Sequence, residues 1–445
     1  MVPQKLLAID GGTPVRSQPL PVRIQFDYNE LQAVTTLFER AMCEGGGFDR
    51  YGIGPQARGT IGELLIPQET EVDQFEADLA RYFGVAHVTA VSSGTAAIHA
   101  ALMALQLEPG TEVITSTLTD PGVVMAILSV LCVPVFADHD YETVLPTVAT
   151  IEAVFSKYTG AIIVTHLMGL VCDMEPIMHF ARRHGISVIG DAAQAHGSTY
   201  GGSRSVPFGH IGVVSMMSTK HITCGGQGGF VATDDASLYL GAKRFADRGK
   251  SFDLISDGIL KRFGGDRVAL GLNYRMTELE ATIGRVQLTK LDFIMTRRRQ
   301  VKDVIHSGIE GFSGIRPVAV VKGVDPNPWA LLFLLNRDRL IVDATHFAAA
   351  VSAEGVAMSK VIPELVPVVD ESSFVRSRTT FGTSDLPYGL GRRDPSVSAL
   401  SAKHPNVDRL SGDLVAVWIH EGWTPRDEID TIEAIRKVNC EYAKR

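Results

Sequence analysis

Seven short runs of apolar, β-branched residues recur along the first two thirds of the chain, and stretches with helical periodicity separate most of them. In one such stretch Ile98, Ala101 and Leu102 share a helical face, and another ends at Gly185. Strands that alternate with helices predict an α/β fold with a mostly parallel sheet. The expected strands are 85–91, 112–115, 133–137, 161–165, 186–190, 211–216 and 229–233.

The alternation of strands and helices stops after the last of these runs. We therefore expect the chain to have three parts. Residues 1–34 form an N-terminal segment, 35–285 a large α/β domain, and 286–445 a smaller α+β domain. Residues 277–304 read as one long helix that leads out of the large domain. Residues 369–412 are rich in Ser, Arg, Gly and Asp, which is typical of loop.

Charge and cysteine content limit the classes of partner that the protein can bind and the cellular compartment in which we expect it. The 445 residues include 42 basic and 50 acidic side chains, a net charge of −8, which disfavours binding to nucleic acid or to anionic membranes. The five cysteines are widely spaced without a CxxC pair, so we expect no disulfide framework and no metal site, and we expect a reducing, cytoplasmic compartment. The N-terminus lacks the pattern of a signal peptide, and no apolar run approaches membrane-spanning length.

Ligands of open α/β sheets bind beyond the carboxyl ends of the strands, so the residues that follow each strand are the candidates for chemistry. After the first strand, Ser93, Gly94 and Thr95 open a helix whose free amides and dipole suit a phosphate, although an ordinary helix cap has the same pattern. Asp191 follows the fifth strand, where a carboxylate faces a ligand or caps a helix. A lone histidine such as His166, after the fourth strand, is more often structural.

Lys220 follows the sixth strand among small and apolar residues, with glycines close behind. The position is either an ordinary surface site or a partly desolvated amine, and desolvation favours the neutral amine that can form a Schiff base. A phosphate site, a carboxylate and a buried lysine at one sheet edge are what pyridoxal 5′-phosphate (PLP) needs. The sequence therefore predicts PLP as the cofactor, with Lys220 at its aldehyde and Asp191 at its ring nitrogen.

At these residues the chain resembles the DegT/DnrJ/StrS family of PLP-dependent sugar aminotransferases, over most of its length and firmly over 70–300. The resemblance rests on ordered motifs, which are SSGTAAIHAALMAL, HLMG, DAAQAHG, STKHITCGGQGG and GLNYRMTELEATIGRVQLTKLD. It implies fold type I of the PLP enzymes, with a seven-stranded large domain, a small domain and a homodimer with shared active sites. The N-terminal GGTPVR is similar to members that act on amino sugars and aminocyclitols.

The resemblance also implies roles for single residues. Lys220 matches the Schiff-base lysine, Asp191 the carboxylate at the pyridine nitrogen, and Gln194 the glutamine packed by the ring hydroxyl. His166 and His196 fall in the family's active-site stretches and are candidate substrate contacts.

The expected phosphate cradle comes from three parts of the chain. Ser93, Gly94 and Thr95 form one part, and Ser215 at the end of the sixth strand forms another. Asn273, in GLNYR, matches an asparagine that reaches the phosphate of the neighbouring subunit in the family's dimer.

The chain departs from the family pattern at two positions. Asp120 stands where the family often has an aromatic residue stacked on the ring, which makes it a candidate substrate contact. Gln227 replaces the glutamate of a GEGG motif. A branch of sugar 3-dehydratases has histidine in place of the lysine, but the spacing from Ser215 and to the glycines puts Lys220, and not His221, at that position.

The resemblance therefore implies transfer of an amino group from glutamate or glutamine to a nucleotide-linked keto-sugar or a keto-cyclitol, in amino-sugar or natural-product biosynthesis. A PLP-dependent lyase or dehydratase on the same fold is an alternative, because Lys220 suits both. A non-catalytic regulatory homologue is a further alternative, which the residue at Asp120 keeps open and the intact Lys220 and Asp191 disfavour.

Overall fold

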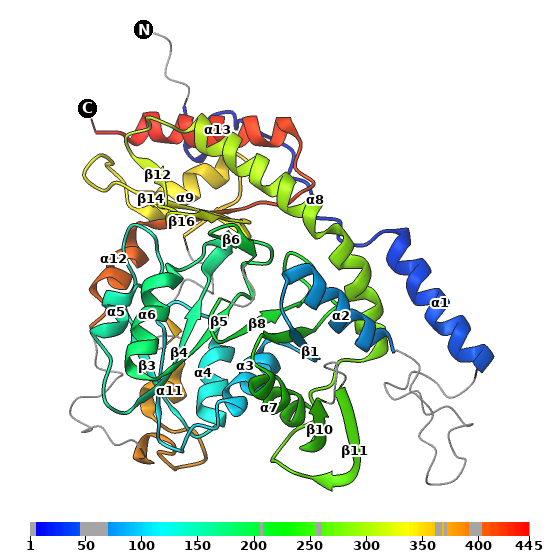
Figure 1. Cartoon of the computed structure of the whole chain (residues 1–445). Helices are drawn as coiled ribbons and strands as arrows, with labels where there is room; N and C mark the ends of the chain where they lie inside the picture. The colour runs from blue at the N-terminus through cyan, green and yellow to red at the C-terminus, as the bar shows by residue number, and fades with distance from the viewer. Residues whose placement is uncertain are drawn as a thin grey trace.

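The computed structural model describes residues 6–44, 70–204, 208–254, 260–360, 367–368, 372–390 and 403–444 (Figure 1). Its centre is a seven-stranded sheet in the order β1-β9-β8-β5-β4-β2-β3. All seven expected strands are present, with ends within two residues of the expected ones. They are β1 (His87–Val91), β2 (Glu112–Ser116), β3 (Val133–Ala137), β4 (Thr159–Thr165), β5 (Ser187–Asp191), β8 (Ile211–Ser215) and β9 (Gly229–Thr233).

The sheet is mostly parallel, as expected. Strands β8, β5, β4, β2 and β3 run parallel to one another, and β9 is antiparallel to both of its neighbours, β1 and β8. Strand β1 therefore runs in the same direction as β8. Six strands thus end at one edge of the sheet, where ligands bind in such folds.

Helices cover both faces of this sheet, which explains why its strands are apolar throughout. In β4, Ala161 and Ile163 face one layer of helices, whereas Ile162 and Val164 face the other. The first layer contains α3 (Gly94–Ala104), α4 (Pro121–Ser129) and α7 (Ala236–Ala246). The second layer contains α2 (Glu71–Phe83), α5 (Val148–Glu152), α6 (Met174–His184) and α8 (Glu278–Gly308).

A second, antiparallel sheet has the order β12-β14-β16-β15. One face of β14 places Leu331 and Phe333 against α8, α9 and α13, whereas the other places Leu332 and Leu334 in the core shared with the large sheet. The two sheets are therefore joined by a common apolar core. The elements are β12 (Ile315–Pro317), β14 (Ala330–Leu335), β15 (Met358–Ser359), β16 (Leu414–Trp418), α9 (Ala344–Ala353) and α13 (Pro425–Tyr442).

The long helix expected over 277–304 is α8, and it links the two sheets (Figure 1). A capping box of Thr277 and Glu280 begins it. Its first half packs against α2, and its last residue lies against α13. The expected division after residue 285 falls inside α8, and the one after residue 34 falls inside α1 (Tyr28–Glu44). The three-part division stays a prediction.

The expectation of loop over 369–412 was wrong in part. Helix α12 (Pro405–Asp413) lies in that range, with the shorter α11 (Ser373–Ser377) and η6 (Tyr388–Leu390). Val407 and Leu410 of α12 are buried in the shared core, so tertiary packing stabilises a helix that the polar composition hides. The remaining elements are short, namely η1 (Ala8–Asp10), η3 (Leu167–Gly169), β6 (Thr199–Tyr200), β7 (Ser203–Arg204), β10 (Lys250–Leu254), β11 (Leu260–Arg267) and β13 (Val324–Asp325). Within the described ranges, no helix combines the length and apolar character needed to cross a membrane.

Candidate active site

The candidate residues gather where β1 and β8 flank the start of β9. Val91 and Ser215, the last residues of β1 and β8, both pair with Gly229. A Cβ at Gly229 would lie 2.6 Å from the Ser93 carbonyl oxygen and 2.7 Å from that of Val214. Only glycine fits between the two strand ends, so this residue lets the turn after β1 approach the turn after β8.

The first part of the site is a helix N-terminus beside a hydroxyl group. Ser93 caps α3, because its Oγ accepts from the Ala96 amide at 3.1 Å. A Cβ at Gly94 would lie 2.6 Å from the Ser215 Cβ and 3.1 Å from its Oγ. Thr95 is exposed in the first turn of α3. The start of α3 therefore lies against the Ser215 side chain, and a helix N-terminus beside a hydroxyl group suits a phosphate.

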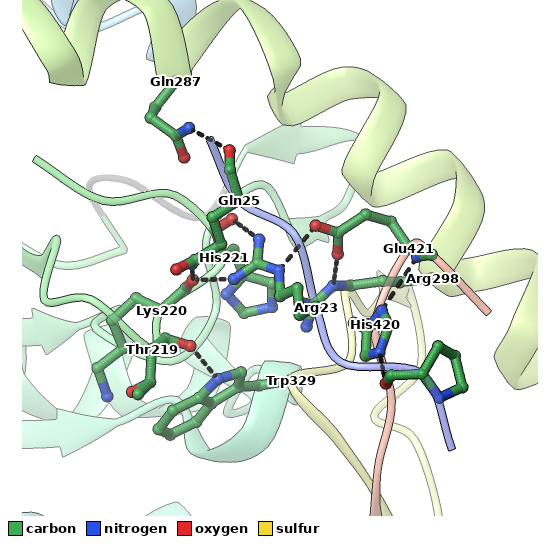
Figure 2. A network of polar contacts seen from close by, with 12 residues as sticks. Arg23, Gln25, Thr219, Lys220, His221, Gln287, Arg298, Trp329, His420 and Glu421 are labelled. Carbon is green, nitrogen blue, oxygen red and sulfur yellow. Dashed lines mark hydrogen bonds and ion pairs between the residues drawn. The ribbon is translucent and has the colours of Figure 1, made fainter. Parts of the chain in front are cut away.

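Lys220 lies on a compact loop that follows β8. Its amide donates to the Met217 carbonyl at 3.0 Å, and a bond from the Ser218 amide to the Gly226 carbonyl closes the loop. The lysine is only 6% exposed. Its Nζ lies 3.8 Å from the ring centroid of Trp329, a cation–π contact (Figure 2).

Sequence reasoning missed the segment that contains Trp329. The Trp329 indole N–H donates to the Thr219 carbonyl at 2.9 Å. Asn327 donates from its side chain to the His196 carbonyl at 2.7 Å, and its own carbonyl accepts from His221 Nε2 at 3.0 Å. The segment 327–329 therefore packs directly on the lysine loop. No local pattern signals this, because the partners lie more than a hundred residues earlier in the chain.

Asp191 ends β5 as a buried carboxylate, 3% exposed, that accepts from the Ala193 amide at 3.0 Å. Burial raises the pKa of Asp191 to about 6, although the Ala193 bond and the Lys220 charge oppose it, and the nearby Asp120 carboxylate adds to the rise. A carboxylate that is this poorly stabilised suits a ligand with a positive or proton-bearing nitrogen.

Gln194 and His196 are buried beside these groups. Gln194 Oε1 accepts from the Met168 amide at 3.1 Å. Burial lowers the pKa of His196 to about 3, and the charge of Lys220 lowers it further, so the imidazole is neutral at pH 7. Its ring centroid lies 5.2 Å from that of His221.

His166 is held by protein groups. Its Nδ1 accepts from the Cys172 amide at 3.3 Å, and its ring meets that of Phe208 edge-on. Burial lowers the pKa of His166 to about 3. These contacts fit a structural role as well as the expected substrate contact.

Asp120 and Asn273 are exposed, as Thr95 is. Asp120 caps α4, since its Oδ1 accepts from the Gly122 amide at 2.7 Å. Asn273 forms an isolated antiparallel β-bridge with Asp247. The carbonyl of the following residue, Tyr274, accepts a hydrogen bond from the Ser92 amide at 2.9 Å. Asn273 therefore lies next to the turn that leads into the cradle, with its side chain exposed.

The sequence model of the DegT/DnrJ/EryC1/StrS aminotransferase family matches residues 62–386. The chain belongs to this family. Two GDP-perosamine synthases are among its relatives, one from Escherichia coli O157:H7, 37% identical over 238 residues, and one from Caulobacter vibrioides, 39% identical over 242 residues. Each match covers 54% of this chain but only 63% and 61% of the relatives, respectively. The matched region therefore spans less than two thirds of these relatives.

The fold of this family member is fold type I of the PLP enzymes, as the resemblance implied. An aminotransferase from Psychrobacter cryohalolentis superimposes with a TM-score of 0.78 at 26% identity, over 95% of this chain and 100% of that one. Enzymes of the family depend on PLP. The buried Asp191 and the cradle between Gly94 and Ser215 fit this cofactor, because they match its ring nitrogen and its phosphate.

The cradle generates the first prediction. We expect Gly94→Ala to weaken PLP binding by about tenfold or more, because the new methyl group must displace Ser215 or the start of α3. Gly226→Ala is the control, since a Cβ there has open space around it. Titration of each cofactor-free variant with PLP measures both affinities. Equal affinities for the two variants would remove Gly94 from the phosphate site.

The state of Asp191 generates the second prediction. Its folded pKa of about 6 lies above the ordinary 3.8, so cofactor-free protein loses stability as the pH rises from 4 through 6. We expect Asp191→Asn to be more stable than wild type at pH 8, by about 1–3 kcal/mol, and equally stable near pH 4. Urea unfolding at the two pH values measures this, and a less stable variant at pH 8 would contradict it.

Proposed function

We propose that this chain is a PLP-dependent sugar aminotransferase that moves an amino group from glutamate or glutamine to a nucleotide-linked keto-sugar. One observation carries the proposal. Lys220, Asp191 and the cradle of Gly94 and Ser215 lie at one edge of one sheet, with the lysine buried and the carboxylate poorly stabilised. The family to which the chain belongs supports it.

Each group in the site has one task in this proposal. The amides of α3, with Ser93, Gly94, Thr95 and Ser215, hold the cofactor's phosphate. Asp191 keeps a proton on the ring nitrogen, because an ion pair there relieves the cost of its own buried charge. When bound, PLP supplies a sink for the electrons left at the donor's α-carbon.

Lys220 serves as anchor and as proton carrier. Its Nζ would hold the aldehyde end of the cofactor and, as a free amine, would take the proton from the donor's α-carbon and deliver it to the cofactor's C4′ carbon. Because the pKa of His196 is lowered to about 3, its imidazole is a weak base, which leaves the nearby lysine as the base. Gln194 follows Asp191 by three residues and is proposed to pack by the ring hydroxyl.

The relatives support the proposed acceptor. Two of them are GDP-perosamine synthases, a name that describes a nucleotide-linked amino sugar, and this favours a nucleotide-linked keto-sugar over a keto-cyclitol. Asp120 is a proposed substrate contact, because it is exposed and lies near enough to Asp191 to affect its pKa. His166 and His196 stay proposed substrate contacts.

The third prediction tests the cofactor attachment and the reaction. We expect borohydride treatment of the PLP-loaded protein, followed by peptide mapping, to place the cofactor on Lys220 and not on the buried Lys243, which is ion-paired with Glu76. Lys220→Ala should lose the label and at least about 1,000-fold of the rate, as is typical when the group that moves the proton is removed.

An incubation with an isotope-labelled donor separates transamination from the alternative reactions. Wild type incubated with L-[α-15N]glutamate or L-[α-15N]glutamine and a nucleotide-linked keto-sugar should give a 15N-labelled amino sugar by mass spectrometry. A dehydrated product without nitrogen would favour the lyase or dehydratase alternative. A label at a lysine other than Lys220 would overturn the site.

The fourth prediction concerns assembly. The exposed Asn273 is proposed to reach the phosphate bound by a second copy in a homodimer with shared sites. We expect a dimer by light scattering, and PLP binding weaker by about 10- to 100-fold in Asn273→Ala, because one charge-assisted hydrogen bond is worth about 1.5–3 kcal/mol.

Mixed dimers give the sharper test. Subunits with Lys220→Ala and with Asn273→Ala, exchanged into one dimer, should form one site with both defects and one site with neither. Activity should rise above that of either variant alone. A monomer that retains PLP fully at low concentration would contradict the shared site.

A further inference from the structure

The N-terminal segment crosses the lysine loop and binds its main chain. Arg23 donates from Nη1 to the Lys220 carbonyl at 2.6 Å and from Nη2 to the His221 carbonyl (Figure 2). Its Nε donates to Glu421 at 2.7 Å. All three nitrogens of one guanidinium therefore have partners, two of them on consecutive carbonyls of the lysine loop.

Glu421 is fixed from a second side. It also binds Arg298, whose Nε lies 2.9 Å from the second carboxylate oxygen and whose side chain is only 1% exposed. Burial by itself would raise the pKa of Glu421, but Arg298 and Arg23 outweigh it, so the pKa lies below its ordinary value and the carboxylate is charged. Arg298 in turn donates to the Pro328 carbonyl at 3.2 Å, directly before Trp329.

The segment around Arg23 is held on both sides. His420 Nε2 donates to the Pro21 carbonyl at 2.7 Å. Gln287 donates to the Gln25 carbonyl at 2.8 Å, and the Gln25 side chain reaches the Lys220 carbonyl at 3.3 Å. The backbone that presents Arg23 is therefore anchored to the C-terminal region before it and to α8 after it.

This geometry constrains the direction of the Lys220 side chain. A planar guanidinium bound to two consecutive carbonyls fixes the peptide plane between Lys220 and His221, and with it the backbone of the lysine. At the other end of the side chain, the Trp329 ring contacts Nζ. A long, flexible side chain is thus restrained at its base and at its tip.

We propose that Arg23 is a positioning residue for Lys220, which holds the main chain of the lysine so that its amine reaches both the cofactor and the donor's α-carbon. The inference rests on the proposed function, because it gives Lys220 the proton-transfer role. It adds a residue of the N-terminal segment, 197 positions before the lysine, to the machinery of the site.

Arg16 is a matched control in the same segment. It also makes several bonds, to Asp427 at 2.7 Å, to Asp430 at 3.1 Å and to the Gln18 carbonyl at 2.6 Å, but these partners lie away from the lysine loop. Arg16→Gln should therefore destabilise the anchoring of the segment without a direct effect on Lys220.

The experiment compares full-length wild type, Arg23→Gln, Arg23→Lys and Arg16→Gln. Hydrogen exchange of peptides covering 217–224, in cofactor-free and PLP-loaded protein, reports the order of the lysine loop. Circular dichroism of the bound PLP reports its fixed orientation. The rate at which L-glutamate or L-glutamine removes the visible absorbance, measured over a range of donor concentrations, reports the proton-transfer half-reaction.

We expect Arg23→Gln to speed hydrogen exchange in 217–224 by about tenfold in both forms and to reduce the dichroism of bound PLP. The half-reaction at saturating donor should slow by about tenfold or more, while the donor concentration that gives half of the maximal rate should change little. Arg23→Lys keeps a charge for Glu421 but not the planar fork, so its values should fall between those of wild type and Arg23→Gln. Arg16→Gln should lower the melting temperature and leave the three other readouts as in wild type.

The proposal is overturned if Arg23→Gln and Arg23→Lys match Arg16→Gln in exchange and dichroism, because Arg23 would then be only a tether. If Arg23→Gln fails to fold, Arg23→Lys decides by the same readouts. Failure of the proposed function has a different signature, in which wild type carries no cofactor on Lys220 while exchange in 217–224 still responds to Arg23→Gln.

Discussion

The site depends on a single reversed strand. β9 lies between β1 and β8, and its first residue, Gly229, pairs with the last residues of both. Because there is no room for a side chain at that point, the turn after β1 and the turn after β8 come together. The close fit of Gly94 against Ser215, and the start of the lysine loop one residue later, follow from this pairing.

Burial then sets the chemistry of the residues that this edge collects. Water is excluded around Asp191, His166 and His196, so the carboxylate holds its charge poorly and both imidazoles are neutral. The positive charge next to Asp191 and His196 is therefore that of Lys220, and neither imidazole adds to it. Two later regions of the chain complete the enclosure, namely the segment 327–329 and the residues around Glu421.

Three distant parts of the chain meet at Lys220. The N-terminal segment supplies Arg23, the large sheet supplies the lysine loop, and the region after α8 supplies Trp329 and Glu421. The apolar core is shared in the same way, since alternate residues of β14 face both sheets. The candidate site is therefore a junction between these parts of the fold.

The sequence by itself determined the seven strands, the long helix, and the residues at the strand ends, including Lys220, Asp191 and Ser93. These follow from local periodicity and from motifs of neighbouring residues, which a chain displays without being folded. Only the tertiary structure decided that α12 is a helix, that Trp329 covers the lysine amine, and that Arg23 binds its main chain. Each of these depends on contacts between residues far apart in the chain, and no local pattern encodes such a contact, because the partner's position exists only after the sheets have packed together.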